Sequence, residues 1–219
     1  MYATISADIV SSTSLSMEET LQLKQKIKDL FQLLKVHYPD FWGRQIKGDY
    51  IECLVPNVSN AFRIALIIKS YIKSIQINEN KEKQDFVTYG VRVAVGIGSL
   101  RIVDVEHDII DGEAIYLSGR SIENMSSPSK GTLAIHINDT KLDNALSTIA
   151  ILTDALMNNT SQRQSEVFFY KLLGLKEADI ADKMGISQAG VNKHSTTGKW
   201  YCIEEALYYF EHINFNDYE

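Results

Sequence analysis

Hydrophobic and polar positions along residues 1–137 alternate between two periods, one typical of strands and one typical of amphipathic helices. This pattern predicts strands over 2–9, 41–46, 50–55, 89–98 and 131–137. It predicts helices over 17–38, 58–75 and 113–125, and a polar loop over 78–85. The first helix begins at a capping box, Ser16 with Glu19, and ends before Pro39. Residues 99–111 leave two interpretations open, a further strand or a lid.

The order strand–helix–strand–strand–helix–strand is that of the split βαβ arrangement, an antiparallel sheet with helices on one face. We therefore expect an α+β fold of the ferredoxin-like type for this part of the chain. In this arrangement the first strand lies beside the central hairpin, which the short connector between 46 and 50 predicts.

Beyond residue 140 the pattern is only helical. A helix over 142–157 is expected to end at Asn158-Asn159-Thr160, and a new helix begins at a second capping box, Ser161 with Gln164. We therefore predict three parts. They are a first domain over 1–138, a helical connector over 139–160 and an all-α domain over 161–219.

The composition is that of an ordinary globular protein, with 219 residues of which 45% are hydrophobic and 23% charged. The formal net charge of −6 argues against a protein coated in nucleic acid, while a small local DNA-binding surface remains compatible with it. Cys53 and Cys202 lie far apart without a CxxC pair, so we expect reduced thiols in a cytoplasmic protein. With no signal peptide and no apolar run of ~18 residues, no membrane span is predicted.

The first strand ends in Asp8, which is followed by the hydroxyl residues Ser11, Ser12 and Thr13. Asp49 lies in the connector of the predicted hairpin, so both carboxylates are expected at one edge of the sheet. Such oxygen ligands hold Mg²⁺ or Mn²⁺, and two such ions can clamp a triphosphate and help to ionise an attacking hydroxyl. Simpler interpretations stay open, with Asp8 as a helix-entry or turn acid and Asp49 as part of a Gly-Asp turn.

A third element is the helix that opens at Gly112. Tyr116 and Arg120 are four residues apart and so share a face of this helix. Arg is the side chain best suited to negative charge that develops on phosphate oxygens. The alternatives are a surface salt bridge from Arg120 to Glu123, and core packing of Tyr116 with its hydroxyl at the rim.

Residues 1–137 resemble the class III nucleotide cyclase homology domain through four motifs in that family's order. The motifs are Asp8-Ile9-Val10-Ser11-Ser12-Thr13, Gly48-Asp49, Val91-Arg92-Val93-Ala94-Val95-Gly96-Ile97-Gly98 and Gly112 to Arg120. The resemblance implies that Asp8 and Asp49 are ligands of two Mg or Mn ions and that Arg120 is the transition-state cation. It also implies a nucleoside triphosphate as ligand and a homodimer, because members of the family form head-to-tail dimers whose sites combine both subunits.

Some positions depart from that family. The family's Asn is Tyr116 here, its base-selecting Lys or Glu is Gln45, and its second base-selecting acid has no clear match, although Asp108 and Asp111 lie close by. These changes leave open a different base, a site that binds nucleotide without turnover, or no ligand. Carried over by position, Arg120 and Tyr116 are the candidate catalytic residues. The candidate nucleotide contacts are Ser11, Ser12, Thr13, Gln45 and Lys47.

Residues 177–193 have helix-turn-helix spacing, with Ala181 small enough for close helix packing, Gly185 at the turn and Ser187 as the second N-cap. The exposed side of the second helix is expected to offer side chains that reach base edges and phosphates of double-stranded DNA. These candidates are Gln188, Asn192, Lys193 and His194. Residues 161–200 hold six Lys or Arg against four Asp or Glu, a local charge of +2 that is weak for tight DNA binding. The alternative is a helical hairpin used for packing or dimerisation.

This segment resembles the helix-turn-helix of sigma-factor and response-regulator proteins, and the whole layout resembles the SatD family of bacterial proteins. Our first hypothesis is a DNA-binding transcriptional regulator whose cyclase-like domain binds a nucleotide and metal. The second is an active cyclase that converts a nucleoside triphosphate into a 3′,5′-cyclic nucleotide and pyrophosphate. The third is an interaction module in which both sites are vestigial.

Overall fold

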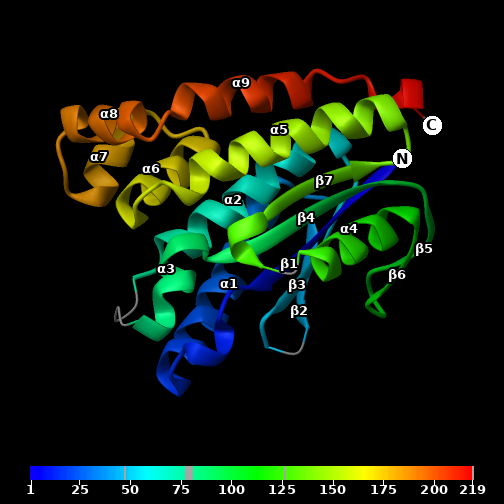
Figure 1. Ribbon diagram of the computed structural model, residues 1–219, viewed down its shortest axis with the longest axis horizontal. Helices are drawn as coiled ribbons and strands as arrows, with labels where there is room; N and C mark the ends of the chain where they lie inside the picture. The colour runs from blue at the N-terminus through cyan, green and yellow to red at the C-terminus, as the bar shows by residue number, and fades with distance from the viewer. Residues whose placement is uncertain (47, 77–80, 126, 219) are drawn as a thin grey trace.

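The computed structural model describes residues 1–46, 48–76, 81–125 and 127–218 (Figure 1). The strands are β1 (Tyr2–Ile9), β2 (Trp42–Ile46), β3 (Tyr50–Val55), β4 (Val91–Gly98), β5 (Leu100–Asp104), β6 (Ile109–Gly112) and β7 (Leu133–Ile137). The α-helices of the first part are α1 (Met17–His37), α2 (Ala61–Ser74), α3 (Gln84–Tyr89) and α4 (Glu113–Asn124). Those that follow are α5 (Thr140–Asn158), α6 (Gln162–Leu172), α7 (Glu177–Met184), α8 (Gln188–Thr197) and α9 (Trp200–Glu211).

A five-stranded sheet with the order β2-β3-β1-β4-β7 forms the centre of the molecule. β1 pairs antiparallel with both β3 and β4, so that Ile5 lies between Cys53 and Val95. The expected antiparallel sheet is wrong at one edge, because β7 pairs parallel with β4 and makes the sheet mixed.

Helices cover both faces of this sheet, which corrects the expectation of helices on one face only. Alternate residues of a strand point to opposite faces. Ala3, Ile5 and Ala7 are buried in the core that α1 and α2 cover, whereas the hydroxyls of Thr4 and Ser6 each lie 2.9 Å from the Ser118 hydroxyl of α4. α4 therefore packs on the face opposite to α1 and α2.

Gly96 allows α4 to lie close to the sheet. A Cβ at this position would be 2.1 Å from the Ala114 carbonyl oxygen and 2.6 Å from the Ser118 amide nitrogen. Both atoms belong to the backbone of α4, which cannot move aside as a flexible side chain can. Only glycine therefore fits here, and Gly96 sets the distance between β4 and α4.

The predicted elements of the first 137 residues are confirmed to within three residues at their ends. Both capping boxes are formed, with the Ser16 and Ser161 hydroxyls accepting from the amides of Glu19 and Gln164. The predicted polar loop over 78–85 is wrong in its described part, because Lys81–Lys83 forms a 3-10 helix and Gln84–Tyr89 forms α3 around the buried Phe86. Residues 77–80 lie outside the described chain. β5 and β6 pair as a separate hairpin, which decides between strand and lid in favour of strands.

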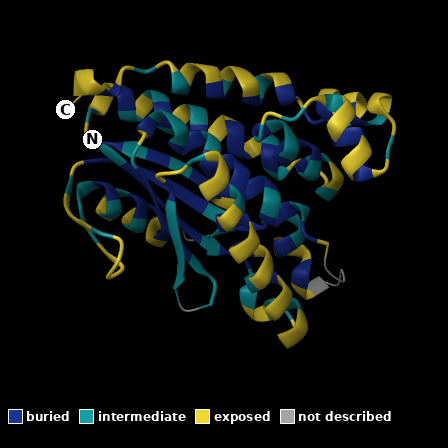
Figure 2. Cartoon of the chain, turned by 180° about the vertical axis from the view of Figure 1, so that it is seen from behind, coloured by how far each residue is buried: buried dark blue, intermediate teal, exposed yellow. Residues whose placement is uncertain are grey.

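The C-terminal helices share one hydrophobic core with the sheet and its helices (Figure 2). The rings of Phe62 in α2 and Phe210 in α9 are 5.4 Å apart, and those of Tyr71 and Phe169 are 4.9 Å apart. α5 lies along β7 and buries the side of the helix that faces the sheet. α9 runs beside α5, and the two chain ends lie at the same end of the molecule (Figure 1). The helical part is thus packed against the sheet-containing part over a continuous apolar interface.

Candidate functional site

Asp8 and Asp49 lie at the same end of the central sheet. In the β1–β3 ladder Asp8 is opposite Tyr50, and the amide of Ile9 donates to the Asp49 carbonyl at 3.2 Å. The antiparallel pairing of β1 with the hairpin β2–β3 therefore makes the two acids neighbours along the backbone, although 41 positions of sequence separate them.

The two carboxylates have different partners. Asp8 points to the α4 side of the sheet and forms an ion pair with Arg92 of β4. A second nitrogen of Arg92 donates to the Met125 carbonyl at 2.6 Å, which fixes the guanidinium at the end of α4. The Asp49 carboxylate instead accepts from the Ser12 hydroxyl at 2.7 Å. A cation that binds Asp8 must compete with Arg92.

A cleft of about 180 Å³ opens beside Asp49 on the α1 side. Ser12 and Thr13 line it together with Lys24 of α1. Ser11 adopts a left-handed conformation with φ 52°, and its carbonyl accepts from the Ser14 amide at 2.9 Å. This tight turn places Ser12 and Thr13 in the lining of the cleft, so two of the three expected hydroxyl residues lie in the same cleft as Asp49.

Gln45 and Lys47, the remaining candidate nucleotide contacts, belong to the β2–β3 hairpin. The Gln45 amide donates to the Gly48 carbonyl and so closes the turn that carries Asp49. Lys47 lies outside the described residues. Gln45 therefore has a structural bond, and its side chain must leave Gly48 before it can contact a base.

The donor set around Asp8 and Asp49 fits a divalent cation only in part. Mg²⁺ prefers oxygen ligands and keeps several waters, so two carboxylates and a Ser hydroxyl are a suitable set. One of the two carboxylates is, however, neutralised by Arg92. Within residues 1–46, 48–76, 81–125 and 127–218, no group of three or more His, Cys, Asp or Glu side chains gathers in a way that could hold a metal.

Tyr116 and Arg120 lie on the outer face of α4. Tyr116 is 51% exposed, so its expected alternative role in core packing is wrong, and its hydroxyl donates to Asp111 at 2.6 Å. The Arg120 guanidinium lies over the Tyr116 ring, 5.9 Å from its centroid, and in the described chain it forms no ion pair with Glu123. The inner face of α4 packs on the sheet through Ala114 and Ser118. Tyr116 and Arg120, on the outer face, therefore point away from Asp8 and Asp49 of their own chain.

The hydrogen bond from Tyr116 also fixes the ionisation of its partner. Together with the Arg101 ion pair it lowers the pKa of Asp111 below its usual value. The same hydrogen bond, and then the negative charge of Asp111, raises the pKa of Tyr116. Asp108, the other nearby acid, offers its carbonyl to Arg44 at 2.5 Å.

The predicted helix pair near the C-terminus is formed by α7 and α8. Gly185 has φ 63°, the left-handed conformation that glycine adopts most readily, and ends α7. The Ser187 hydroxyl accepts from the Gly190 amide at 3.1 Å and caps α8. Ile180 and Val191 are fully buried between the helices. The exposed side of α8 presents Gln188, Asn192 and Lys193, with His194 half-buried beside them.

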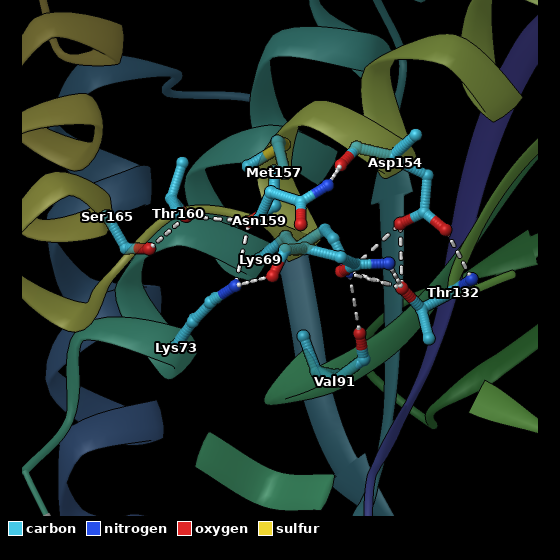
Figure 3. A network of polar contacts seen from close by, with 11 residues as sticks. Lys69, Lys73, Val91, Thr132, Asp154, Met157, Asn159, Thr160 and Ser165 are labelled. Atoms are coloured by element: carbon cyan, nitrogen blue, oxygen red, sulfur yellow. Dashed lines mark hydrogen bonds and ion pairs between the residues drawn. The ribbon is translucent and has the colours of Figure 1, made fainter. Parts of the chain in front are cut away.

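Three charged residues with important contacts were missed by sequence reasoning. Arg92 is the single charged residue in an otherwise apolar strand, which is a signal for a specific partner such as Asp8. Lys69 and Lys73 lie on the apolar stretch of α2 and are both buried (Figure 3). Lysine is almost never buried without a partner, so this pair also marked a polar network.

The network around these lysines connects α2 to the end of α5 (Figure 3). Lys69 is 3.2 Å from the Asp154 carboxylate and donates to the Thr132 hydroxyl at 2.6 Å. Lys73 donates to the carbonyls of Met157 and Asn158, at 2.7 and 2.8 Å. Burial, together with the Lys69 ammonium, lowers the pKa of Lys73 to about 7.

Comparison of the chain with protein-family models, with curated proteins and with solved structures gave no match. Of the helices in the described ranges, none has both the length and the apolar character needed to cross a bilayer.

Proposed function

We propose that this protein is a DNA-binding transcriptional regulator whose first 138 residues bind a nucleotide with a divalent metal. The observation that carries the proposal is the α7–α8 pair, in which a capped second helix presents Gln188, Asn192 and Lys193 to solvent. Amide and ammonium groups on one helix face are the side chains that read base edges and phosphates in the major groove.

The charges around α8 support moderate affinity. Lys193 and Lys183 are exposed and have no carboxylate partner among the described residues, whereas Arg163 and Lys171 are paired with Glu166 and Glu177. Few phosphates are therefore neutralised by one chain, and binding should depend on a second copy. Two chains related by a twofold axis would present two α8 helices to successive half-sites.

Mobility shift in a duplex library, with selection over several rounds, tests the DNA-binding part. Asn192→Ala and Lys193→Ala should each weaken binding about tenfold or more, and Lys193→Ala should also lower the salt dependence. Lys141→Ala is the matched control, because Lys141 is an exposed lysine at the start of α5. The proposal fails if no duplex is retained, or if the α8 variants bind as the control does.

The nucleotide part of the proposal is supported by the neighbouring positions of Asp8 and Asp49 and by the cleft at Ser12 and Thr13. The strand order β2-β3-β1-β4 supports a ferredoxin-like arrangement of the cyclase type. Bound metal would replace Arg92 as the partner of Asp8, and the freed guanidinium would lie within the same end of the sheet as the incoming phosphates. Metal and nucleotide should therefore bind together rather than singly.

Thermal shift with each nucleoside triphosphate and Mn²⁺ tests this part, since a ligand that binds only the folded state raises the melting temperature. Asp49→Asn should abolish the shift, and Asp40→Asn, an exposed acid before β2, should leave it unchanged. A shift that survives Asp49→Asn, or no shift with any of the four triphosphates, contradicts nucleotide binding at this site.

A second function, cyclase activity, is favoured by the outward position of Tyr116 and Arg120 on α4. These residues lie on the face of α4 that points away from the sheet and from Asp8 of their own chain, and a head-to-tail partner could bring them to its Asp8. Chromatography of each triphosphate after incubation with Mn²⁺ separates the two functions. A cyclic product that the wild type forms and Arg120→Ala does not form identifies a cyclase. If the wild type forms no cyclic product, the protein is a regulator that only binds nucleotide.

A further inference from the structure

A second cleft, of about 520 Å³, lies where the end of α4, the segment 127–131 and the C-terminal half of α5 meet at the edge strand β7. Its volume is within the range of small-molecule sites. Its polar lining includes Asn124, Ser127, Ser129, Lys130, Asn158 and Asn159, and it is completed by Thr88 and Tyr89 of α3 and Asp154 of α5. Leu133, Ile151 and Ala155 supply an apolar wall. A cleft with one apolar wall and converging amides and hydroxyls suits a small polar metabolite.

The charges in and behind this cleft are mainly positive. Lys130 is exposed at its rim and has no carboxylate partner in the described chain. Asp154 is the acid in the wall, but both its oxygens are already occupied, one by Lys69 and the Thr132 hydroxyl and the other by the Thr132 amide at 2.7 Å. Lys73, behind the cleft, adds a further buried positive charge at pH values below its lowered pKa of about 7. Water screens buried charges poorly, so the field in the cleft favours an anion.

The hydroxyl groups narrow the choice of anion. The Ser127 and Ser129 hydroxyls lie 2.8 Å apart in the segment that carries Lys130, and one donates to the other. At least one hydroxyl proton of the pair thus remains available to a ligand. A lysine beside two serine hydroxyls suits a phosphate, which has several acceptor oxygens, better than a carboxylate.

We propose that this cleft binds a small organic monophosphate, with its phosphate at Lys130, Ser127 and Ser129 and its polar body against Asn158 and Asn159. The cleft is separate from the Asp49 cleft, which lies where β1 ends beside the β2–β3 hairpin and shares no lining residue with it. The proposal therefore does not depend on nucleotide binding at Asp8 and Asp49.

Asn158 connects this cleft to the helical part of the protein. Its side-chain amide donates to the Thr132 hydroxyl at 3.0 Å, and its backbone carbonyl accepts from the Lys73 ammonium. Three residues later Ser161 caps α6, which packs against α7 and α8. A ligand that displaces the Asn158 side chain therefore perturbs the C-terminal end of α5 just before α6 begins, and the cleft is placed to regulate the α7–α8 pair through α6.

Calorimetric titration of the full chain with ribose 5-phosphate and with glycerol 3-phosphate tests the proposal, with free ribose and glycerol as controls. We expect saturable binding of at least one phosphate at or below about 1 mM and none of the unphosphorylated compounds. Lys130→Met should weaken binding at least about tenfold, because it removes a charge-assisted hydrogen bond. The matched control Lys141→Met and the variant Asp49→Asn should bind as the wild type does.

Trp200 provides a readout for the connection to the helical part. It packs on Phe168 of α6 at 5.3 Å between ring centroids, and in a Trp42→Phe background it is the single tryptophan of the chain. Bound phosphate should shift its emission, and Asn158→Ala should reduce that shift more than it reduces binding.

Absence of saturable binding by both phosphates overturns the proposed site, as does equal loss in Lys130→Met and Lys141→Met. Loss of binding in Asp49→Asn assigns the phosphate to the nucleotide site and also overturns it. Binding that depends on Lys130 but leaves Trp200 emission unchanged supports the site and overturns its regulatory connection.

Discussion

The ion pair of Lys69 and Asp154 gives a quantitative prediction. The Lys69 side chain is fully buried and that of Asp154 is 6% exposed, so neither charge is stabilised by water. Asp154→Asn leaves the shape almost unchanged, but it removes the negative charge and can turn an amide donor towards Lys69. Removing one partner of a buried pair costs about 3–5 kcal/mol of unfolding free energy, because the other charge stays buried without compensation.

Lys69 can limit this cost by losing its proton. Deprotonation at pH 7 of a group with an ordinary pKa near 10.4 costs about 5 kcal/mol, so the part of the destabilisation that comes from the unpaired Lys69 charge should not exceed that value. Burial already lowers the pKa of Lys69 in the wild type, with Asp154 opposing that shift. Without Asp154, Lys69 should be neutral in the folded protein and protonated in the unfolded chain.

This difference in protonation makes the destabilisation depend on pH. In the variant the unfolded chain binds one more proton than the folded protein, so raising the pH stabilises the variant by about 1.4 kcal/mol per pH unit. The wild type keeps the Lys69 proton in both states as long as the pH is below the pKa of this lysine in the folded protein. The gap between the two proteins should therefore narrow as the pH rises from 7 until that pKa is reached.

Urea denaturation at several pH values, followed by tryptophan fluorescence, measures the gap. The control is the double variant Lys69→Met/Asp154→Asn, which removes both charges and should recover to within about 2 kcal/mol of the wild type. If Asp154→Asn lies within about 1 kcal/mol of the wild type at pH 7, or if the gap does not change with pH, the buried pair does not have the role given to it here.

Three further substitutions test other features of the fold. Gly96→Ala should destabilise the protein by about 3 kcal/mol or more in urea denaturation, because its Cβ would overlap the α4 backbone, whereas Gly119→Ala, where a Cβ meets nothing within 4 Å, should be neutral or slightly stabilising. Lys73→Met should flatten the rise of melting temperature with pH above about 7, since the folded protein loses the Lys73 proton there while the unfolded chain keeps it up to ~10.4; an unchanged pH profile would exclude Lys73 as its source. Ser187→Ala should cost about 1 kcal/mol and speed amide hydrogen exchange in the first turn of α8, and unchanged exchange would show that the cap does not stabilise the helix.

Most helices and strands could be predicted because their signals are local. The apolar periods, the capping boxes at Ser16 and Ser161 and the turn at Gly185 act within a few residues of sequence. The parallel pairing of β7 could not be predicted in this way, since it depends on where α4 packs. That position depends in turn on Gly96, whose lack of a Cβ allows α4 to approach β4. This close contact is known only once both elements are placed in the structure.

The candidate site shows the same division. The hairpin order was enough to predict that Asp8 and Asp49 end up as neighbours across β1 and β3. It gave no information on the competitor, because Arg92 reaches Asp8 from a strand 84 positions later in the chain. Likewise, helical spacing put Tyr116 and Arg120 on one face of α4, but only packing decides that this face points outward.

The contact between Phe62 and Phe210 has a consequence for how the two ends of this chain communicate. A domain joined by a flexible linker can move relative to its neighbour, and it can be exchanged or removed without destabilising that neighbour. Here α9 packs into the same hydrophobic core as the sheet and α2, and Arg63 of α2 forms an ion pair with Glu211 of α9 at 2.6 Å. The effect of a bound ligand must therefore be transmitted through small shifts of closely packed core side chains. A chain truncated at residue 160 would expose the apolar surface that the C-terminal helices cover.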